Sequence, residues 1–439
     1  MRKNRKKITD EIKVPEDVAS KIKRRITNLT SFREELKERL DEDTSFLMNL
    51  IMAGSVALGG SDIHVEPTEK NAKIRLRMDG VLQDVIEIEK ELYKSLSSRI
   101  KLLSGVKLNV EKEPQDGRFT ILYPGENERA IEIRMSALPS EHGETFVMRL
   151  LDPEKLITLE KLGLRKDLLK RLKKEIKKPN GMVIVTGPTG SGKTTSLYAF
   201  LKYIRSSEVK IITIEDPIEY HLEGISQTAV SPNDGYDFAN GLRAIVRQDP
   251  DAILVGEIRD LETATIALQA ALTGHAVFST LHTNDAAGAI PRLQALGEKA
   301  VNIAPALNII IAQRLVRKLC KRCRIPISME EEDEGLFKKI EEGMSDVSKE
   351  IINYSKETDI YKAKGCKDCN FTGYRGRIGI FEALPVDEEI ENLIFSNPST
   401  SEIRNKAIKK GMITMKQDGI IKMLEGKTTV TEINRVVGL

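Results

Sequence analysis

The stretch Gly181-Met-Val-Ile-Val-Thr-Gly-Pro-Thr-Gly-Ser-Gly-Lys-Thr-Thr195 decides the fold of this chain. Four apolar residues, Met182 to Val185, predict a buried strand, and a glycine-rich turn follows before Lys193 and Thr194 open a helix. A strand, such a turn and a helix in succession form the context that a P-loop requires, which argues against a chance match in a glycine-rich loop. The glycines leave backbone N–H groups free to surround phosphate oxygens, and the start of the helix adds the positive end of its dipole.

The P-loop predicts a role for each of its polar residues. Lys193 is expected to reach the β- and γ-phosphates of a nucleotide, and the Thr194 hydroxyl is expected to bind Mg²⁺. The predicted nucleotide-binding residues are Gly187, Pro188, Thr189, Gly190, Ser191, Gly192, Lys193, Thr194 and Thr195.

Length and composition bound the rest of the chain. Its 439 residues are enough for two or three domains with their own cores. A formal net charge of +3, with 31% charged residues, argues against a general nucleic-acid binder, which would carry a clear basic excess. The longest apolar runs are too short or too polar to span a membrane, and no signal peptide follows Met1, so we expect a cytoplasmic protein.

The first 45 residues are highly charged and predict a helical or flexible arm. Residues 1–25 carry ten Lys and Arg against four Asp and Glu. A basic arm that touches acidic lipid or an acidic partner is one interpretation, and a solvated helical face or flexible tail is the one we prefer, because no aromatic residue interrupts the basic run. From residue 46 to 150, a helical apolar pattern and several alternating segments, one pair joined by Asp79-Gly80, predict an α/β domain.

Four arginines of this domain, Arg75, Arg77, Arg118 and Arg134, have two interpretations. Arginines on strands are usually surface charges that pair with acidic residues across the sheet. Before a nucleotide-binding core, they can instead supply positive charge to a γ-phosphate. The residues alone do not decide between the two.

Acidic residues end two of the apolar strands that follow the P-loop. Glu215 follows Val209 to Ile214, and Glu257 follows the strand that starts near Asp251. The carboxyl ends of parallel strands are where ligands bind, so both carboxylates are candidates for the Mg²⁺ and for the attacking water. We prefer Glu215 as the general base, although the roles can be reversed, and we expect Asp251 to be structural.

Histidines stand at both ends of the segment from His275 to His282. A lone histidine beside a core strand is most often a hydrogen-bonded structural residue. His282, however, lies at the carboxyl end of the strand, where a group that senses the γ-phosphate would lie, and it is therefore a candidate catalytic residue.

Together these blocks resemble the secretion ATPases, in the branch of type II secretion and type IV pilus assembly. The P-loop is similar to their Walker A motif, and three further blocks are similar to their Asp box, Walker B and His box. Those blocks are Ile214-Glu-Asp-Pro-Ile-Glu-Tyr220, Val255-Gly-Glu-Ile-Arg-Asp260 preceded by Arg247-Gln-Asp-Pro-Asp251, and His275 to Asn284. Ser61-Asp-Ile-His-Val-Glu-Pro67, Arg75-Leu-Arg-Met-Asp-Gly80 and Gln115-Asp-Gly-Arg118 resemble the second N-terminal domain of that branch.

The resemblance implies a RecA-like core, preceded by a smaller α/β (PAS-like) domain, in a homo-hexameric ring that hydrolyses ATP with Mg²⁺. In this family ATP lies between the two domains, and Arg118 and Arg134 fall on the positions that reach its phosphates. Arg243, Arg247 and Arg259 match arginines in or near the core site. Hydrolysis is expected to drive an inner-membrane platform protein that assembles pilins or pseudopilins, which places the protein at the inner face of the cytoplasmic membrane.

Four cysteines, in two CxxC pairs, predict a tetrahedral zinc site, because each pair presents two thiolates from one tight turn. The ligands are Cys320, Cys323, Cys366 and Cys369, and the site resembles the zinc subdomain of the assembly ATPases. The predicted segments are an arm (1–45), an α/β domain (46–150), a linker helix (151–180), an ATPase core (181–319), a zinc-binding subdomain (320–370) and a helical C-terminal region (371–439).

The N-terminal arm departs from the pattern of this family. The assembly ATPases generally carry a large first N-terminal domain, whereas here only about 45 highly charged residues precede the second domain. Docking through that first domain is therefore in doubt. A P-loop motor that acts on nucleic acid, such as a RecA-like helicase or a conjugation ATPase, is the alternative function, although the near-neutral charge gives no expectation of direct nucleic-acid binding.

Overall fold

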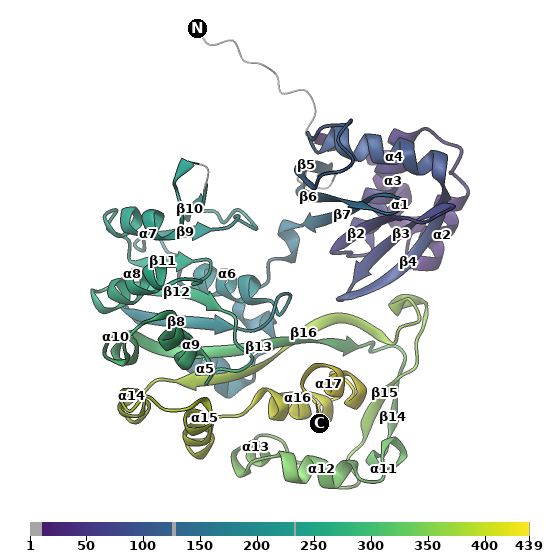
Figure 1. Ribbon diagram of the computed structural model, residues 1–439. Coiled ribbons are helices and arrows are strands. Elements are labelled where there is room, and N and C mark those ends of the chain that lie inside the picture. Colours follow the sequence, from purple (N-terminus) through teal and green to yellow (C-terminus); the bar gives the residue numbers. More distant parts are fainter. Residues whose placement is uncertain (1–10, 125–128, 232–233, 439) are drawn as a thin grey trace. The chain divides into compact units, whose positions relative to one another are not determined.

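The computed structural model describes residues 11–124, 129–231 and 234–438, which form two compact units (Figure 1). The first unit contains the described residues up to 155 together with two short segments, Cys320–Cys323 and Lys364–Arg375. The second unit contains Leu156–Leu319, Arg324–Ala363 and the described residues from Gly376 onward. Each unit has its own sheet and its own buried core.

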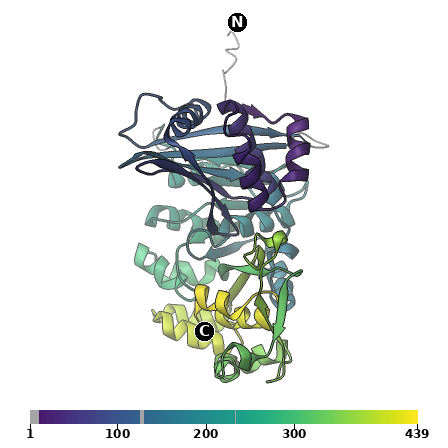
Figure 2. The same ribbon diagram turned by 90° about the vertical axis from the view of Figure 1, so that its right-hand side faces the viewer.

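The first unit is a seven-stranded sheet in the order β1-β5-β6-β7-β2-β3-β4, with helices α1 to α4 gathered beside it (Figures 1 and 2). Side chains of β3 alternate between buried and half-buried, because one face of the sheet meets the helices. The elements are β1 (Glu11–Lys13), α1 (Glu16–Arg25), α2 (Leu29–Lys37), α3 (Thr44–Ala57), β2 (Asp62–Pro67), β3 (Asn71–Met78), β4 (Val81–Glu89), α4 (Lys90–Leu103), β5 (Gln115–Tyr123), β6 (Arg129–Ser140) and β7 (Gly143–Leu151).

Residues 11 to 37 of the predicted arm contain helices α1 and α2, as its helical alternative expects, but they are part of the first unit and not a separate arm; the first ten residues lie outside the described residues. Strand β1 pairs in parallel with β5, and helices α1 and α2 bury apolar side chains in the core of the first unit. Ile22, Phe32 and Leu36 are at most 3% exposed. Apolar residues at helical spacing therefore outweigh the high charge of this segment, and the domain includes β1, α1 and α2 in addition to the residues from 46 onward.

The second unit is built on a sheet in the order β10-β9-β11-β12-β8-β13-β16, in which the pairs from β10 through β13 are parallel. Its core elements are η2 (Leu159–Leu162), α5 (Lys166–Glu175), β8 (Gly181–Thr186), α6 (Lys193–Ile204), β9 (Ile211–Glu215), β10 (Ser226–Ala229), α7 (Phe238–Val246), β11 (Ala252–Val255), α8 (Leu261–Leu272), β12 (Ala276–Leu281), α9 (Ala289–Leu296), α10 (Ala300–Ala306), β13 (Leu307–Leu319) and β16 (Tyr374–Pro385).

The remaining elements of the second unit follow β13 and β16. They are β14 (Arg324–Ile327), α11 (Met329–Glu332), α12 (Leu336–Gly343), α13 (Asp346–Ile351), β15 (Ile360–Ala363), α14 (Glu388–Phe395), α15 (Thr400–Lys409), α16 (Met415–Leu424) and α17 (Val430–Val437).

Two predicted boundaries differ from the structure. Residues 320–370 are not one subdomain, because the cysteine segments belong to the first unit while residues 324–363 belong to the second. The C-terminal region is not purely helical, because β16 adds a strand to the sheet of the second unit beside β13. Its buried side chains Ile380 and Phe381 explain why this segment joins the core.

Candidate nucleotide site and cysteine cluster

The turn between β8 and α6 contains glycines with positive φ. Gly187 has a φ of 147°, and a Cβ atom there would lie 2.5 Å from the carbonyl oxygen of Gln313 and 2.7 Å from Ser191 Oγ. Only glycine fits such a position. Ser191 Oγ is buried and has no hydrogen-bond partner among the described residues, so it is available to an oxygen of a bound phosphate.

Lys193 opens α6 and folds back over the turn. Its Nζ donates to the carbonyl oxygens of Gly187, at 2.9 Å, and of Pro188, at 3.3 Å. Burial lowers the pKa of this ammonium group, and the charge of Glu257 opposes that shift. With the half-buried Thr194 beside it at the start of α6, these donors fit the phosphates of a nucleotide, and the threonine hydroxyl suits Mg²⁺.

Gln313, on β13, supports this turn from the neighbouring strand. Its Nε2 donates to the carbonyl oxygen of Ser191 at 2.8 Å, and its Oε1 accepts from Ser196 Oγ at 2.7 Å. Gln313 is only 2% exposed. The sequence analysis missed this residue, whose signal is a buried amide that directly follows the apolar run Ile309 to Ala312.

Glu257 follows β11 and lies between two cationic or titratable side chains. Its carboxylate accepts from the guanidinium of Arg259, which raises the pKa of that arginine, and lies 3.5 Å from His282 Nε2. His282 comes directly after β12, with its side chain 51% exposed. The charge of Glu257 also acts on Lys193. Three predicted site residues, Lys193, Glu257 and His282, therefore interact with one another through Glu257.

Glu215, at the end of β9, has a different environment. It is 3% exposed, and its carboxylate accepts hydrogen bonds from Thr213 Oγ1 at 2.6 Å, from Gln227 Nε2 at 3.2 Å and from the hydroxyl of Tyr198. Burial raises the pKa of this carboxyl, the three hydrogen bonds oppose the rise, and the charge of Glu219 adds to it. Tyr198 was also missed, although a tyrosine hydroxyl on a buried helix face needs a polar partner.

Two residues are structural, as we expected. Asp251 Oδ2 accepts from the backbone N–H of Lys210 at 2.6 Å. His275 Nδ1 lies 3.0 Å from the carbonyl oxygen of Ala270, at the C-terminus of α8.

Three of the four arginines singled out in the sequence, Arg77, Arg118 and Arg134, lie in one row across the sheet of the first unit. Arg118 pairs with Arg134, Arg134 with Arg149, Arg149 with Asp62, and Asp62 with Arg77 on successive neighbouring strands. Directly paired residues point to the same face, where adjacent like charges repel each other. Such a row favours binding of an anion, and the strand register adds Arg149, which the sequence analysis missed.

Acidic residues accompany this row of arginines. Asp62 accepts from Arg149 Nε at 3.0 Å and lies 3.7 Å from Arg77 Nε, whereas Arg134 Nε lies 3.5 Å from Glu132. Arg75 instead lies between Glu66 and Asp84, at 3.2 Å and 2.8 Å, which supports its interpretation as a paired surface charge.

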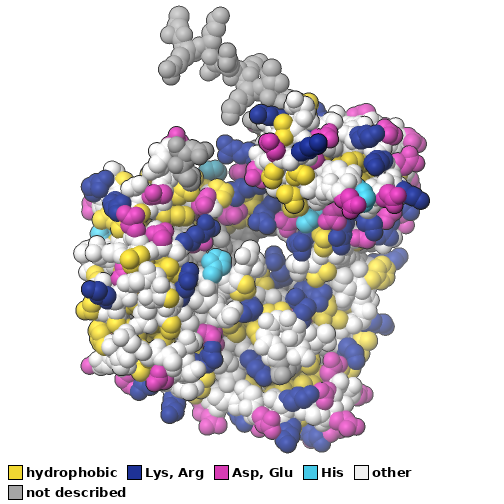
Figure 3. Space-filling model, viewed as in Figure 1, with side chains coloured by type: hydrophobic (Ala, Val, Ile, Leu, Met, Phe, Trp, Pro, Cys, Tyr) yellow, Lys and Arg dark blue, Asp and Glu magenta, His cyan; other side chains and the backbone are white. Residues whose placement is uncertain are grey.

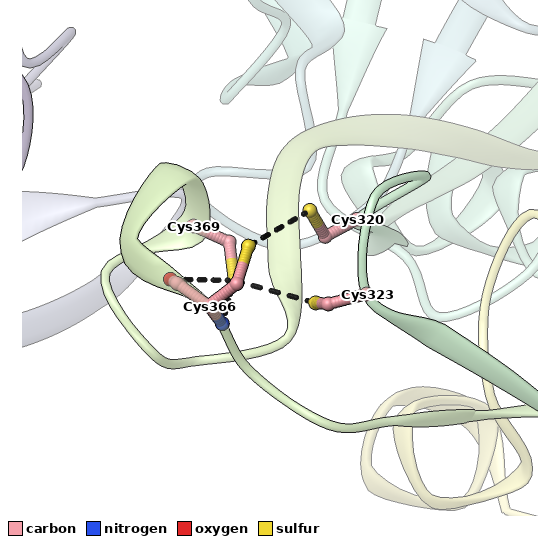
Figure 4. A group of neighbouring side chains, drawn as sticks. All are labelled: Cys320, Cys323, Cys366 and Cys369. Carbon is pink, nitrogen blue, oxygen red and sulfur yellow. Dashed lines mark hydrogen bonds between the residues drawn. The ribbon is translucent and has the colours of Figure 1, made fainter.

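The four cysteines converge from the segments that follow β13 and precede β16 (Figure 4). Their sulfur atoms all lie within 4.8 Å of one another. The Sγ–Sγ distances are 3.9 Å between Cys320 and Cys366, 3.7 Å between Cys323 and Cys369, and 3.7 Å between Cys366 and Cys369. A tetrahedral zinc ion with Zn–S bonds of about 2.3 Å requires sulfur atoms roughly 3.8 Å apart, so these residues fit zinc.

Backbone amides support the cluster. Cys369 Sγ accepts from the N–H of Cys366 at 3.1 Å and of Gly373 at 3.3 Å, contacts that would stabilise a thiolate. Burial raises the pKa of the Cys323 thiol. A bound cation would favour the thiolate form of its ligands.

The face of the molecule shown in Figure 3 carries charges of both signs. On the face shown in Figure 3, Lys and Arg side chains alternate with Asp and Glu side chains, as a net charge of +3 leads one to expect. Among the described residues we find no helix with both the length and the apolar character of a membrane span.

Comparison with known proteins gives matches over most of the chain. The family model described as Type II/IV secretion system protein matches residues 39–435. The type II secretion system ATPase E of Vibrio cholerae is 43% identical over 405 residues, which cover 92% of this chain and 77% of that protein. The type IV pilus assembly ATPase PilB of Myxococcus xanthus is 42% identical over 388 residues, which cover 88% of this chain and 66% of that protein.

Solved structures confirm the predicted fold class. The pilus retraction motor PilT with bound ADP has a TM-score of 0.59 and 27% identity, over 88% of this chain and 95% of that one. The ATPase DotB of Legionella pneumophila has a TM-score of 0.62 and 21% identity, over 89% of this chain and 95% of that one, and shows the fold alone. These relatives are secretion and pilus ATPases, and nothing in them favours the nucleic-acid alternative.

Proposed function

Because the chain belongs to the Type II/IV secretion system protein family and is an ATPase of that family, we propose that it is a hexameric motor. In this proposal, ATP hydrolysis powers the assembly of pilin or pseudopilin subunits, in type IV pilus biogenesis or in type II secretion. The observation that carries the proposal is the grouping of Lys193, Glu257 and His282 at the end of the parallel sheet, beside a turn that only glycine can form.

The environments of the two carboxylates support different roles for them. Glu257 is paired with Arg259 and lies near His282 and Lys193, as suits a group on the phosphate and Mg²⁺ side of the site. Glu215 is desolvated and its pKa is raised, as suits a general base that works near neutral pH. We therefore assign Glu215 as the base that takes a proton from the attacking water.

Bound Mg²⁺ would neutralise charge that develops on the phosphates. Thr194 would hold it, and Lys193 would bind the β- and γ-phosphates while His282 responds to the γ-phosphate. Arg118 and Arg134, which remain predictions from the sequence, would add positive charge to the phosphates. Zn²⁺ bound to the four cysteines would be structural, because all four of its ligand positions are filled by thiolates.

The partner in this proposal is an inner-membrane platform protein of a pilus or secretion machine. The chain would associate with the inner face of the cytoplasmic membrane through that partner. The homologues support this, since the names of two of them place them in type II secretion and in type IV pilus assembly.

The test compares ATPase turnover of the full chain alone, with the cytoplasmic domain of a candidate platform protein, and with DNA or RNA. We expect stimulation by the platform domain and none by nucleic acid. Strong stimulation by nucleic acid alone would overturn the proposal and favour the helicase or conjugation class.

The base assignment has its own test in Glu215→Gln. This variant keeps the size of the side chain and one acceptor oxygen but cannot accept a proton. We expect ATP binding at wild-type affinity and a turnover about 10²- to 10⁴-fold lower, which is the usual contribution of general base catalysis. Turnover like that of the wild type would remove Glu215 from this role.

A further inference from the structure

We propose that Tyr198 is a positioning residue that holds Glu215 in place and keeps it ionised for hydrolysis, an inference that rests on the proposed function and deepens it. Tyr198 is on α6, the helix that Lys193 opens, and it is 1% exposed. Its hydroxyl donates to Glu215 Oε2. The helix that follows the P-loop is thus connected directly to the carboxylate that we assign as the base.

The same hydroxyl also organises the chain after β9. It accepts from the backbone N–H of Glu219 at 3.2 Å and lies 3.5 Å from that of Tyr220. The rings of Tyr198 and Tyr220 pack edge to face, with centroids 6.2 Å apart. One oxygen therefore links α6, the end of β9 and the segment after it.

The other carboxylate oxygen, Oε1, has two separate donors. Thr213 donates from within β9 at 2.6 Å, and Gln227 donates from β10 at 3.2 Å. Gln227 is itself fixed, because its Nε2 also donates to the carbonyl oxygen of Tyr220 at 3.0 Å and its Oε1 accepts from the N–H of Leu222 at 2.7 Å. If Tyr198 is changed to phenylalanine, Glu215 Oε1 keeps its donors Thr213 and Gln227, whereas Glu215 Oε2 loses the Tyr198 hydroxyl.

These contacts determine the protonation of Glu215. Burial is the largest influence and favours the neutral acid, as does the charge of Glu219, while the donors Thr213, Tyr198 and Gln227 favour the carboxylate. A protonated Glu215 cannot accept a proton from water. Removing the Tyr198 hydroxyl should therefore free the side chain to rotate and move its titration to higher pH.

The test is the pH dependence of kcat and KM for Tyr198→Phe in the full chain. We expect kcat to fall about 10- to 100-fold at neutral pH, as for loss of a hydrogen bond to a charged group, with the KM for ATP unchanged. The acidic limb of the profile should move to higher pH. Tyr203→Phe, on the same helix with its ring beside Lys173 and Lys177, is the matched control and should leave the profile unchanged.

Two further variants keep the inference distinguishable from the proposed function. Thr213→Val removes a donor from Oε1 with little change in volume and should shift the acidic limb in the same direction, which guards against misfolding of one variant. In a Glu215→Gln background, Tyr198→Phe should have no further effect on kcat. The role of Tyr198 would be overturned if the acidic limb of the pH profile stayed in place in both Tyr198→Phe and Thr213→Val. It would also be overturned if Tyr198→Phe lowered kcat as much in the Glu215→Gln background as in the wild type. Wild-type turnover of Glu215→Gln alone would overturn the base assignment instead.

Discussion

Replacing Cys369 by serine is the sharpest test of the cysteine cluster. Cys369 is 2% exposed, and its sulfur accepts from two backbone amides and lies 3.7 Å from those of both Cys323 and Cys366. A hydroxyl at this position is a poor zinc ligand near neutral pH, so Cys369→Ser leaves three thiolates for a metal that prefers four.

The size of the effect follows from the number of ligands. Zinc binding by structural sites amounts to roughly 10–16 kcal/mol, and an equal share among four ligands is about 2.5–4 kcal/mol for each thiolate. Loss of one ligand should weaken the affinity for zinc roughly 60- to 700-fold, at about 1.4 kcal/mol for each factor of ten. We expect about one zinc ion per wild-type chain and a substoichiometric amount in the variant after equilibration with a chelator.

The assay measures metal per chain by elemental analysis and affinity by competition with a chromophoric chelator. Thr372→Val is the matched control, because it removes a hydroxyl that donates to the carbonyl oxygen of Cys369 at 2.6 Å but leaves all four sulfur atoms. Its zinc content should match that of the wild type. A wild-type chain purified under reducing conditions with no zinc, and with four thiols that react freely, would refute the assignment.

Two more predictions concern buried polar contacts. In the first unit, the buried Glu144 carboxylate lies 2.7 Å from Lys101 Nζ. Lys101→Met leaves this carboxylate without its counter-charge and should lower the free energy of unfolding by about 3–5 kcal/mol. Hydrogen exchange of the first unit measures this, and Lys94→Met, which removes an exposed ion pair, should change it by less than about 1 kcal/mol. In the second unit, Gln313→Leu should weaken ATP binding about 2- to 12-fold by removing the hydrogen bond to the Ser191 carbonyl. An unchanged dissociation constant in calorimetry would contradict that role of Gln313.

The sequence was sufficient for the parts of the fold whose signals are local. The strand before the P-loop and the helix after it follow from an apolar run and a glycine pattern within fifteen residues. The packing of the helices before residue 45 into the core was missed because charge was weighed over spacing, although Ile22, Phe32 and Leu36 mark their buried faces. Strand β16 was missed because its partner β13 is distant in sequence, and pairing between distant strands leaves no periodic signal of its own.

The candidate site shows the same division. Lys193, Glu257 and His282 could be predicted because each has a fixed place at the end of a strand or the start of a helix. Gln313 and Tyr198 could not, because their contacts are hydrogen bonds to residues of other elements: Gln313 and the Ser191 carbonyl are 122 positions apart, and Tyr198 and Glu215 are 17 apart. A polar group in an apolar element indicates that it has a partner, but the sequence does not identify that partner.

Strand order explains how both carboxylates can serve one nucleotide. In the order β9-β11-β12-β8, β11 is two strands from the P-loop strand and β9 is three, which is roughly 10 and 14 Å at the usual spacing of about 4.8 Å. Glu257 therefore acts on Lys193 through its charge, whereas Glu215 is linked to the P-loop through α6. Lys193 and Tyr198 are about 7.5 Å apart along that helix, within a single rigid element. If a bound phosphate displaced the start of α6, it would also displace the Tyr198 hydroxyl that contacts Glu215, the residue proposed as the base, and in that proposal the helix couples nucleotide binding to the position of Glu215.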